Sequence, residues 1–173
     1  MRMKTIKALA IAAVLFMAVS MVPALAQASR DLNFVVTLAE WYDLYIGQNT
    51  ITFTDVAPAI QQNPPSVQIP ANENPVDVRA FAILIPSSSL TLTVTAQTDF
   101  DATIPASTVS WTVTGAGYQA GSLQAGTPVT VGSWSGAAFH WHEGTMSFSF
   151  LRDYLTQAPG TYSLIATYTL SKV

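Results

Sequence analysis

The chain has 173 residues and no cysteine, and seven basic against ten acidic residues give it a formal charge of −3 at pH 7. Without disulfides, the stability of the fold must come from packing alone. Basic residues this sparse cannot neutralise a row of phosphates, so nucleic acid is not an expected partner, and neither is anionic lipid.

The first 26 residues have the pattern of a cleaved signal peptide. Three basic residues within the first seven precede an uncharged run that closes on Ala24-Leu25-Ala26, a signal-peptidase pattern. A retained membrane anchor is the alternative, because the run is nearly long enough to span a bilayer. Cleavage before Gln27 leaves four basic and ten acidic residues, a formal charge of −6, on one domain at 27–173. We therefore expect a secreted, cell-surface protein with no membrane association after cleavage.

The longest alternating run of the chain covers residues 32–46. Its inward face is formed by Leu32, Phe34, Val36, Leu38, Tyr42, Leu44 and Ile46. Because fifteen residues is long for one strand, we expect a bend between Glu40 and Asp43. Residues 47–49 fit a hairpin loop, and 50–54 fit the returning strand.

The middle of the chain begins with a connection. Five prolines between 57 and 75 are incompatible with a helix or a central strand. Residues 76–85 become apolar on both faces, which predicts a central strand buried on both sides. Residues 90–96 alternate apolar residues with threonine, so their threonine face should be exposed to water.

The second half reads as further strands separated by loops. A strand is predicted at 109–113, with Val109, Trp111 and Val113 facing inward. Residues 115–136 are predicted to be mostly loop, with one strand at 129–134. We then expect a hairpin that turns at Glu143-Gly144, with Phe139 and Trp141 facing the core on its first arm. Its second arm is 146–150, after which residues 152–158 fit one helical turn.

The last segment, 159–173, has the clearest alternation in the chain. Its inward face consists of Tyr162, Leu164, Ala166, Tyr168 and Leu170. We expect this strand to pair with 146–150. In total, eight or nine short strands without helical periodicity predict an all-β, antiparallel, immunoglobulin-like β-sandwich with Greek-key connections.

The cluster His140-Trp141-His142-Glu143 is a candidate metal site. Residues i and i+2 of a strand share a face, so His140 and His142 could bind one ion, with Glu143 completing the set. The alternative is a solvent-facing histidine pair, because the sequence holds no other His or Cys. Asp99 and Asp101 are a calcium candidate, with an ordinary Asp-rich turn as the alternative. Overall we expect no cofactor.

Catalysis is not expected. No Gly-x-Ser-x-Gly nucleophile elbow occurs, and Gly132–Gly136 has Trp134 where the serine would be. The aromatic residues indicate a different activity, stacking on sugar rings, for which Trp41 and Trp134 are the candidates.

Two short motifs carry a resemblance to known exported proteins. Trp111-Thr112-Val113 together with Tyr168-Thr169-Leu170 resembles the paired motifs of WxL-type surface domains, with Val113 in place of the first leucine and Tyr168 in place of the second tryptophan. These departures leave wall attachment outside what the resemblance implies. Gly160-Thr161-Tyr162 at the start of a final strand is similar to spore-coat-U-type and related fimbrial subunits.

These observations favour a non-enzymatic structural or adhesive surface protein that assembles into filaments or layers by strand addition. The candidate donor segment carries Leu32, Phe34, Val36 and Leu38; the alternative is that it pairs within its own domain. A carbohydrate-binding module is the second hypothesis, and a metal-binding exported protein the third. The expected partners are further copies of the chain, other surface proteins or cell-wall glycan.

Overall fold

The computed structural model describes residues 33–37, 41–56 and 65–172. The chain divides into two units, Met1–Leu38 and Ala39–Val173, and both sheets belong to the second. The predicted leader at 1–26, the predicted anchors Leu32 and Leu38, and Glu40 of the predicted bend lie outside the described residues.

Within the described residues, no helix is long and apolar enough to cross a membrane.

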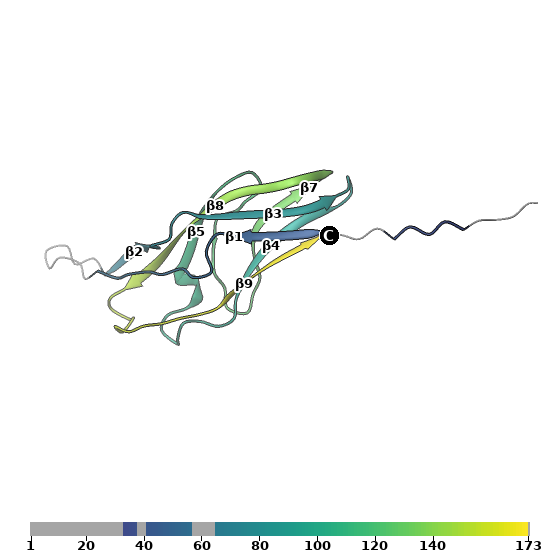
Figure 1. Cartoon of the computed structure of the whole chain (residues 1–173). Helices are drawn as coiled ribbons and strands as arrows, with labels where there is room; N and C mark the ends of the chain where they lie inside the picture. The colour runs from purple at the N-terminus through teal and green to yellow at the C-terminus, as the bar shows by residue number, and fades with distance from the viewer. Residues whose placement is uncertain (1–32, 38–40, 57–64, 173) are drawn as a thin grey trace, which may run out of the picture. The chain divides into compact units, whose positions relative to one another are not determined.

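The described part of the second unit is all-β, as predicted, and its strand count of nine lies within the predicted eight or nine (Figure 1). The strands are β1 (Tyr42–Ile46), β2 (Ser66–Pro70), β3 (Val76–Leu84), β4 (Ser89–Ala96), β5 (Val109–Thr114), β6 (Gly121–Ser122), β7 (Val129–Ser135), β8 (Ala138–Asp153) and β9 (Ala166–Lys172). One 3-10 turn, η2 (Ala106–Thr108), precedes β5.

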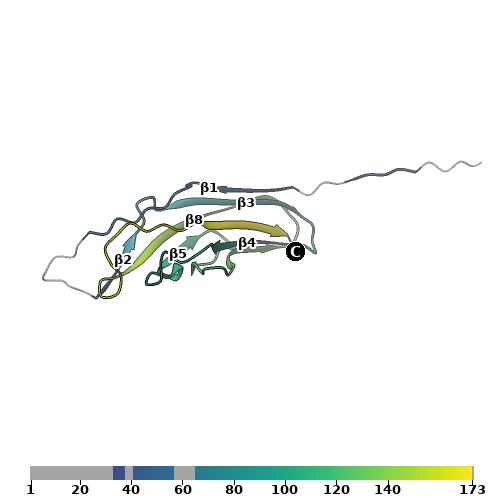
Figure 2. The same cartoon turned by 90° about the horizontal axis from the view of Figure 1, so that it is seen from below.

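The strands form two antiparallel sheets. The larger has the order β1-β3-β8-β5-β6, with β2 paired to the far end of β8, and the smaller has the order β7-β4-β9. Figure 2 shows them as two layers, with β1 and β3 in one and β4 in the other. The 16-residue β8 organises the larger sheet, because β3 and β2 pair along one of its edges and β5 along the other.

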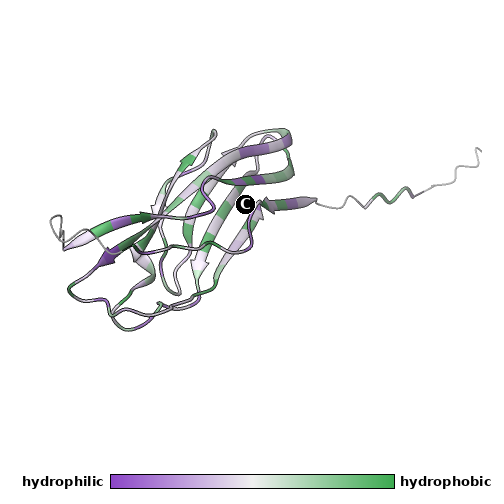
Figure 3. Ribbon diagram, turned by 60° about the vertical axis from the view of Figure 1, so that its left-hand side comes forward, coloured by the Kyte–Doolittle hydropathy of each residue, from purple (hydrophilic) through white to green (hydrophobic). Residues whose placement is uncertain are grey.

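The core lies between the layers and follows from the period of two in the strands. Every second residue of β3 is buried, including Val78 and Ala80 at 0% exposure, and β4 does the same with Leu90 and Leu92. The alternation of apolar and polar residues along the strands is visible in Figure 3. Trp111 is 2% exposed, which confirms its predicted place in the core.

Strand β3 is central, as predicted, but it is buried on one face only. Its inward residues contact the core, whereas Ile83 on the other face is 40% exposed. The outer face of the larger sheet is therefore not covered by another layer of the described residues, and the prediction of burial on both sides was wrong.

The predicted hairpin at 139–150 was also wrong, because β8 continues through Glu143 and Gly144 without a turn. A continuous strand keeps one parity, so Met146 and Phe148 inward place Phe139 and Trp141 outward. Gly144 is there for a different reason: a Cβ at this position would lie 2.7 Å from Cδ2 of Tyr118. The absence of a side chain at Gly144 leaves space for the Tyr118 ring and does not mark a turn.

The terminal strand pairs with β4, not with 146–150 as predicted, and regular pairing begins only at Ala166. Its predicted inward face is confirmed at four positions, since Leu164, Ala166, Tyr168 and Leu170 pack against the core. The predicted helical turn before it is a single turn in which the amide of Gln157 donates to the carbonyl of Asp153 (3.1 Å). The connection after β8 therefore crosses to the other sheet instead of folding back as a hairpin.

Residues 50–54 do not form the predicted returning strand, because β1 pairs with β3 instead. Only Phe53 makes a bridge, to Ala71. The backbone amide of Thr52 donates to the carboxylate of Glu73 (2.7 Å), which fixes this loop by side-chain bonds. The proline-rich connection contains one strand that the sequence did not predict, β2 at the edge.

Candidate functional site

The outer face of the larger sheet carries an exposed group of apolar side chains, which we call the outer aromatic face. It consists of Trp41, Tyr45, Phe81, Ile83, Phe139 and Trp141. Trp41 is 62% exposed, Phe139 is 72% exposed and Trp141 is 38% exposed. The face is built by β1, β3 and β8, which are adjacent strands with fixed register.

The register arranges these side chains in rows across the strands. Phe139 lies opposite Ile83, and Trp141 lies opposite Phe81. The amide of Ile83 donates to the carbonyl of Trp41 (3.4 Å), so this tryptophan extends the first row. The first row is thus entirely apolar, and the second has Asp43 opposite Phe81 on the β1 side.

Phe81 is the centre of the aromatic contacts. Its ring centroid lies 5.8 Å from that of Trp41, 5.6 Å from that of Phe139 and 5.4 Å from that of Trp141. The first two contacts are edge-to-face, an arrangement that the ring quadrupoles favour. The four rings therefore form one contiguous cluster rather than scattered exposed residues.

The next rows along the same strands are charged and polar. Arg79 lies opposite Tyr45 and Glu143, with its guanidinium 5.4 Å from the Tyr45 ring centroid and 3.8 Å from a Glu143 carboxylate oxygen. A carboxylate oxygen of Asp77 is 3.9 Å from the same guanidinium. A shallow depression at this end of the face is lined by Asp77, Arg79, Thr114, Gly115, Glu143, Gly144 and Thr145.

The sequence of β3 contains a signal for this face that a single strand does not reveal. In β3 the inward positions hold the small residues Ala80 and Ala82, whereas the outward positions hold the large Phe81 and Ile83. Apolar residues on both parities predict burial on both faces. In the structure the small residues of β3 face the core and the large ones face outward.

The candidate metal residues are divided between the two faces. His140 and His142 have the inward parity of β8, with ring centroids 4.6 Å apart and with His140 exposed, while Glu143 points outward and contacts Arg79. Among the described residues no group of three or more His, Cys, Asp or Glu side chains is placed to hold a metal ion. Glu143 therefore cannot complete a site with this histidine pair.

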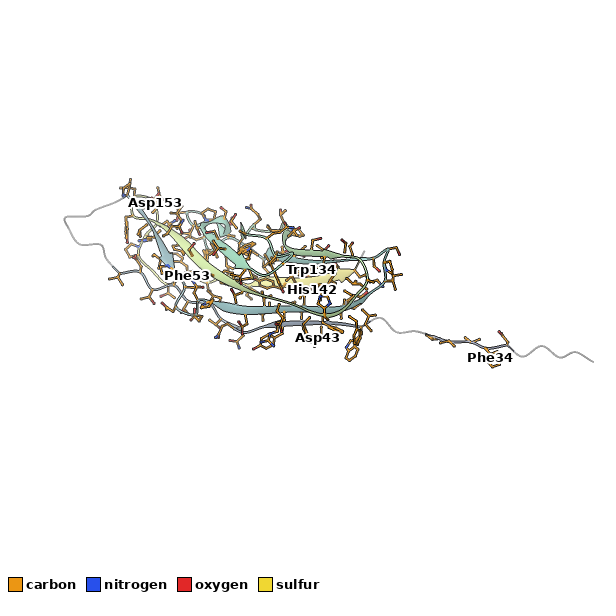
Figure 4. All side chains as sticks on the ribbon, turned by 90° about the horizontal axis from the view of Figure 1, so that it is seen from above. Phe34, Asp43, Phe53, Trp134, His142 and Asp153 are labelled. Carbon is orange, nitrogen blue, oxygen red and sulfur yellow. The ribbon has the colours of Figure 1, made fainter. Side chains whose placement is uncertain are left out.

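His142 packs into the end of the core. Its ring stacks on Trp134 with a centroid distance of 4.7 Å and an interplanar angle of 15° (Figure 4). Its Nε2 is buried and has no hydrogen-bond partner among the described residues. Burial, and secondarily the neighbouring His140, lower the pKa of His142 below its ordinary value. The imidazole is therefore held in its neutral form.

The two candidate sugar-binding tryptophans have opposite environments. Trp41 belongs to the outer aromatic face. Trp134 is only 8% exposed, donates from its indole nitrogen to the carbonyl of Ala116 (2.8 Å), and contacts Tyr118 edge-to-face. Both faces and the edge of the Trp134 ring are therefore unavailable to a sugar.

The aspartates of the calcium candidate bind the backbone of their own loop. A carboxylate oxygen of Asp101 accepts from the amides of Thr103 (2.6 Å) and Ile104 (2.9 Å). Asp99 accepts from the amide of Ala106 (2.7 Å). These bonds match the turn alternative, in which the side chain replaces a backbone acceptor.

Residues 33–37, which include two of the candidate assembly anchors, carry no strand assignment. Phe34 is 81% exposed, Val35 is 80% exposed and Val36 is 78% exposed. No family model, curated protein or solved structure matches this chain. The functional conclusion accordingly rests on the chemistry and geometry of these residues.

Proposed function

We propose that this is an exported, non-enzymatic structural or adhesive surface protein whose copies assemble by strand addition. The proposal includes cleavage of the leader at 1–26, an immunoglobulin-like Greek-key sandwich, and kinship with fimbrial subunits. The observation that carries it is the edge position of β9, which pairs with β4 on one side and has no other described strand in its sheet.

An edge strand presents backbone donors and acceptors to any further strand. Strand β9 is the last strand of the smaller sheet, and β1, the edge of the larger sheet, approaches it. The inward side chains along these two edges are only partly buried. They are Leu44, Ile46, Leu164, Ala166, Tyr168 and Leu170. One further strand, added beside β9, would cover them.

The donor in this proposal is the segment Arg30 to Leu38 of a second copy. Its even positions from 32 to 38 are all apolar, so in an extended conformation they would project to one side and could pack against these partly buried side chains. The exposed Phe34 and Val36 support this role, because large apolar side chains left in water favour a partner. The backbone bonds would supply affinity and the alternate side chains would supply register.

The direct test is a truncated protein that lacks residues 27–37. We expect the full mature chain to form multimers in sedimentation velocity and filaments or layers in electron micrographs, and the truncated chain to stay monomeric with an unchanged circular dichroism spectrum. Multimers of the same size from the truncated chain would contradict strand addition.

Two point variants make the test specific to one face of the donor. Phe34→Asp should prevent assembly, because a carboxylate cannot be buried between the sheets without a partner. Val35→Asp is the matched control, since Val35 is equally exposed but has the opposite parity and would face water in the added strand. Equal loss of assembly in both variants would show that the segment does not add as a strand in this register.

Export is tested separately. The amino-terminal sequence of the protein recovered from the culture medium or the cell surface should begin at Gln27, which Edman sequencing or intact mass would show.

A further inference from the structure

We propose that the outer aromatic face, together with its charged rows, binds a neutral linear polysaccharide. This inference does not depend on strand addition, because the face lies on the outward side of β1, β3 and β8, whereas the proposed donor would add at the edge of β9.

The first step is the exposure of the rings. Single exposed apolar residues are ordinary on a protein surface, but contiguous groups mark binding sites. Here Trp41, Phe139 and Trp141 are between 38% and 72% exposed, and all three contact the one ring of Phe81. Contacts of this kind hold the rings in place without a ligand, so little side-chain freedom is left to lose on binding.

The second step is the polar chemistry beside the rings. A pyranose presents an apolar face of C–H groups and a rim of hydroxyls, each both donor and acceptor. The aromatic rows can pack against the C–H face of the sugar. In the next rows, the carboxylates of Glu143 and Asp77 can accept hydrogen bonds from the sugar hydroxyls, and the Arg79 guanidinium can donate to them. A few polar groups beside aromatic side chains are what a small-ligand site requires.

The third step is the shape of the face. The apolar row, the mixed row and the charged row follow one another along adjacent strands, and Thr145 opposite Thr114 continues them with hydroxyls. From Phe139 to Thr145 the strand extends about 20 Å at ~3.3 Å per residue. An extended chain of several sugar units fits this length better than a single compact molecule.

Charge argues against three other partners of this face: a second copy, a nucleic acid and an anionic membrane. The face carries three carboxylates, on Asp43, Asp77 and Glu143, against one guanidinium, on Arg79. Two copies placed face to face would bring like charges together, and a phosphate backbone or an anionic membrane would be repelled. A neutral polyhydroxyl chain has no such conflict and uses the carboxylates as hydrogen-bond acceptors.

The experiment is affinity gel electrophoresis of the mature protein in native gels that contain hydroxyethyl cellulose, xylan or glycol chitin. We expect at least one of these polymers to retard the protein, with a retardation that persists in 0.5 M NaCl because the ligand is neutral. The combined variant Phe139→Ala and Trp141→Ala should bind about tenfold more weakly or worse, because it removes two of the rings that pack against the sugar.

The matched control is Leu151→Ala combined with Leu155→Ala, which removes two exposed apolar side chains outside the face. It should be retarded like the wild type, and thermal unfolding should show both double variants folded. If the aromatic variant is unfolded, the binding test uses the wild-type protein instead. Iodide should quench its exposed tryptophans, and the bound polymer should protect them from quenching.

Three results would overturn the inference. In the first, none of the three polymers retards the wild-type protein. In the second, the aromatic variant is folded and is retarded as strongly as the wild type. In the third, the wild type sediments as a dimer and the aromatic variant as a monomer, which would make a second copy the occupant of the face. The Phe34→Asp variant separates the two proposals: it should lose assembly and keep polymer binding, so either proposal can fail without the other.

Discussion

Gly144 shows how one residue can fit two structures equally well in the sequence. Glu143-Gly144 has the composition of a turn, yet the chain passes through it as a strand because the Tyr118 ring needs the space that a Cβ would occupy. The Tyr118 hydroxyl donates to the carbonyl of His142 (2.7 Å), and burial raises the pKa of this tyrosine to about 12. The glycine, the ring and the carbonyl therefore form one packing unit.

Gly144→Ala should accordingly destabilise the protein. The added methyl group would meet the carbonyl of Thr114 as well as the ring, and overpacking of this kind costs about 1–3 kcal/mol. Urea unfolding followed by circular dichroism measures the change. Gly47→Ala is the control, because its nearest neighbour would be at 3.4 Å and its loss should be smaller. Equal stability of the two variants would mean that β8 does turn at this glycine.

His142 predicts a pH dependence of stability. Its pKa is lowered by burial and then by His140, so the folded chain binds fewer protons than the unfolded chain, whose histidine titrates near ~6.5. The contribution of this residue is therefore complete above that pH and is lost as the pH falls towards the lower folded pKa. The free energy of unfolding should decline from about pH 6.5 downwards.

The variant His142→Phe isolates this effect. Phenylalanine keeps a flat ring against Trp134 and removes the buried Nε2 that has no partner, so the variant should be as stable as the wild type or more stable. Its stability should fall less between pH 7 and pH 5, as guanidinium unfolding at several pH values would show. An identical pH profile in both proteins would place the titrating group elsewhere.

At the scale of elements, β9 kept its predicted faces but not its predicted neighbour. The alternation is a property of the strand itself, and Leu170 and Tyr168 contact the core as expected. The strand with which β9 pairs depends on the connection that precedes it. The chain after β8 crosses to the smaller sheet, where β9 lies beside β4. A local sequence pattern therefore predicts which residues of a strand share a face, but it does not predict the neighbouring strand.

Leu170→Asp compared with Thr169→Asp tests the faces of β9. The first places a carboxylate against the core opposite Leu92 and should cost at least about 2 kcal/mol, while the second changes an exposed side chain and should stay within about 0.5 kcal/mol. Thermal unfolding of both variants gives the comparison. Similar losses would mean that the register of β9 is shifted by one residue.

For the whole molecule, the parity of β8 determines what faces the solvent. With Met146 inward, the larger sheet has a packed inner face and an outer face that presents aromatic rings to the solvent. The opposite parity on the first arm would have buried Phe139 and Trp141 and left the histidines outside. The candidate site therefore exists only because β8 is one strand.

Tryptophan quenching checks this arrangement in the intact protein. Trp41 and Trp141 are 62% and 38% exposed, whereas Trp111 and Trp134 are 2% and 8% exposed. If the four tryptophans contribute equally, iodide should quench roughly half of the fluorescence of the native protein. After unfolding in guanidinium, iodide should quench nearly all of the fluorescence. Trp141→Phe should reduce the quenched fraction; an unchanged fraction would place Trp141 in the core.

The sequence by itself determined that this chain forms strands and which residues of β4, β5 and β9 face the core, because those follow from a local period of two. Only the tertiary structure decided the partners of β1 and β9, the continuity of β8, and thereby the outer aromatic face and the place of Trp134. The reason is physical. Parity states which residues share a face, but which face is buried, and against which strand, depends on contacts between residues distant in the chain.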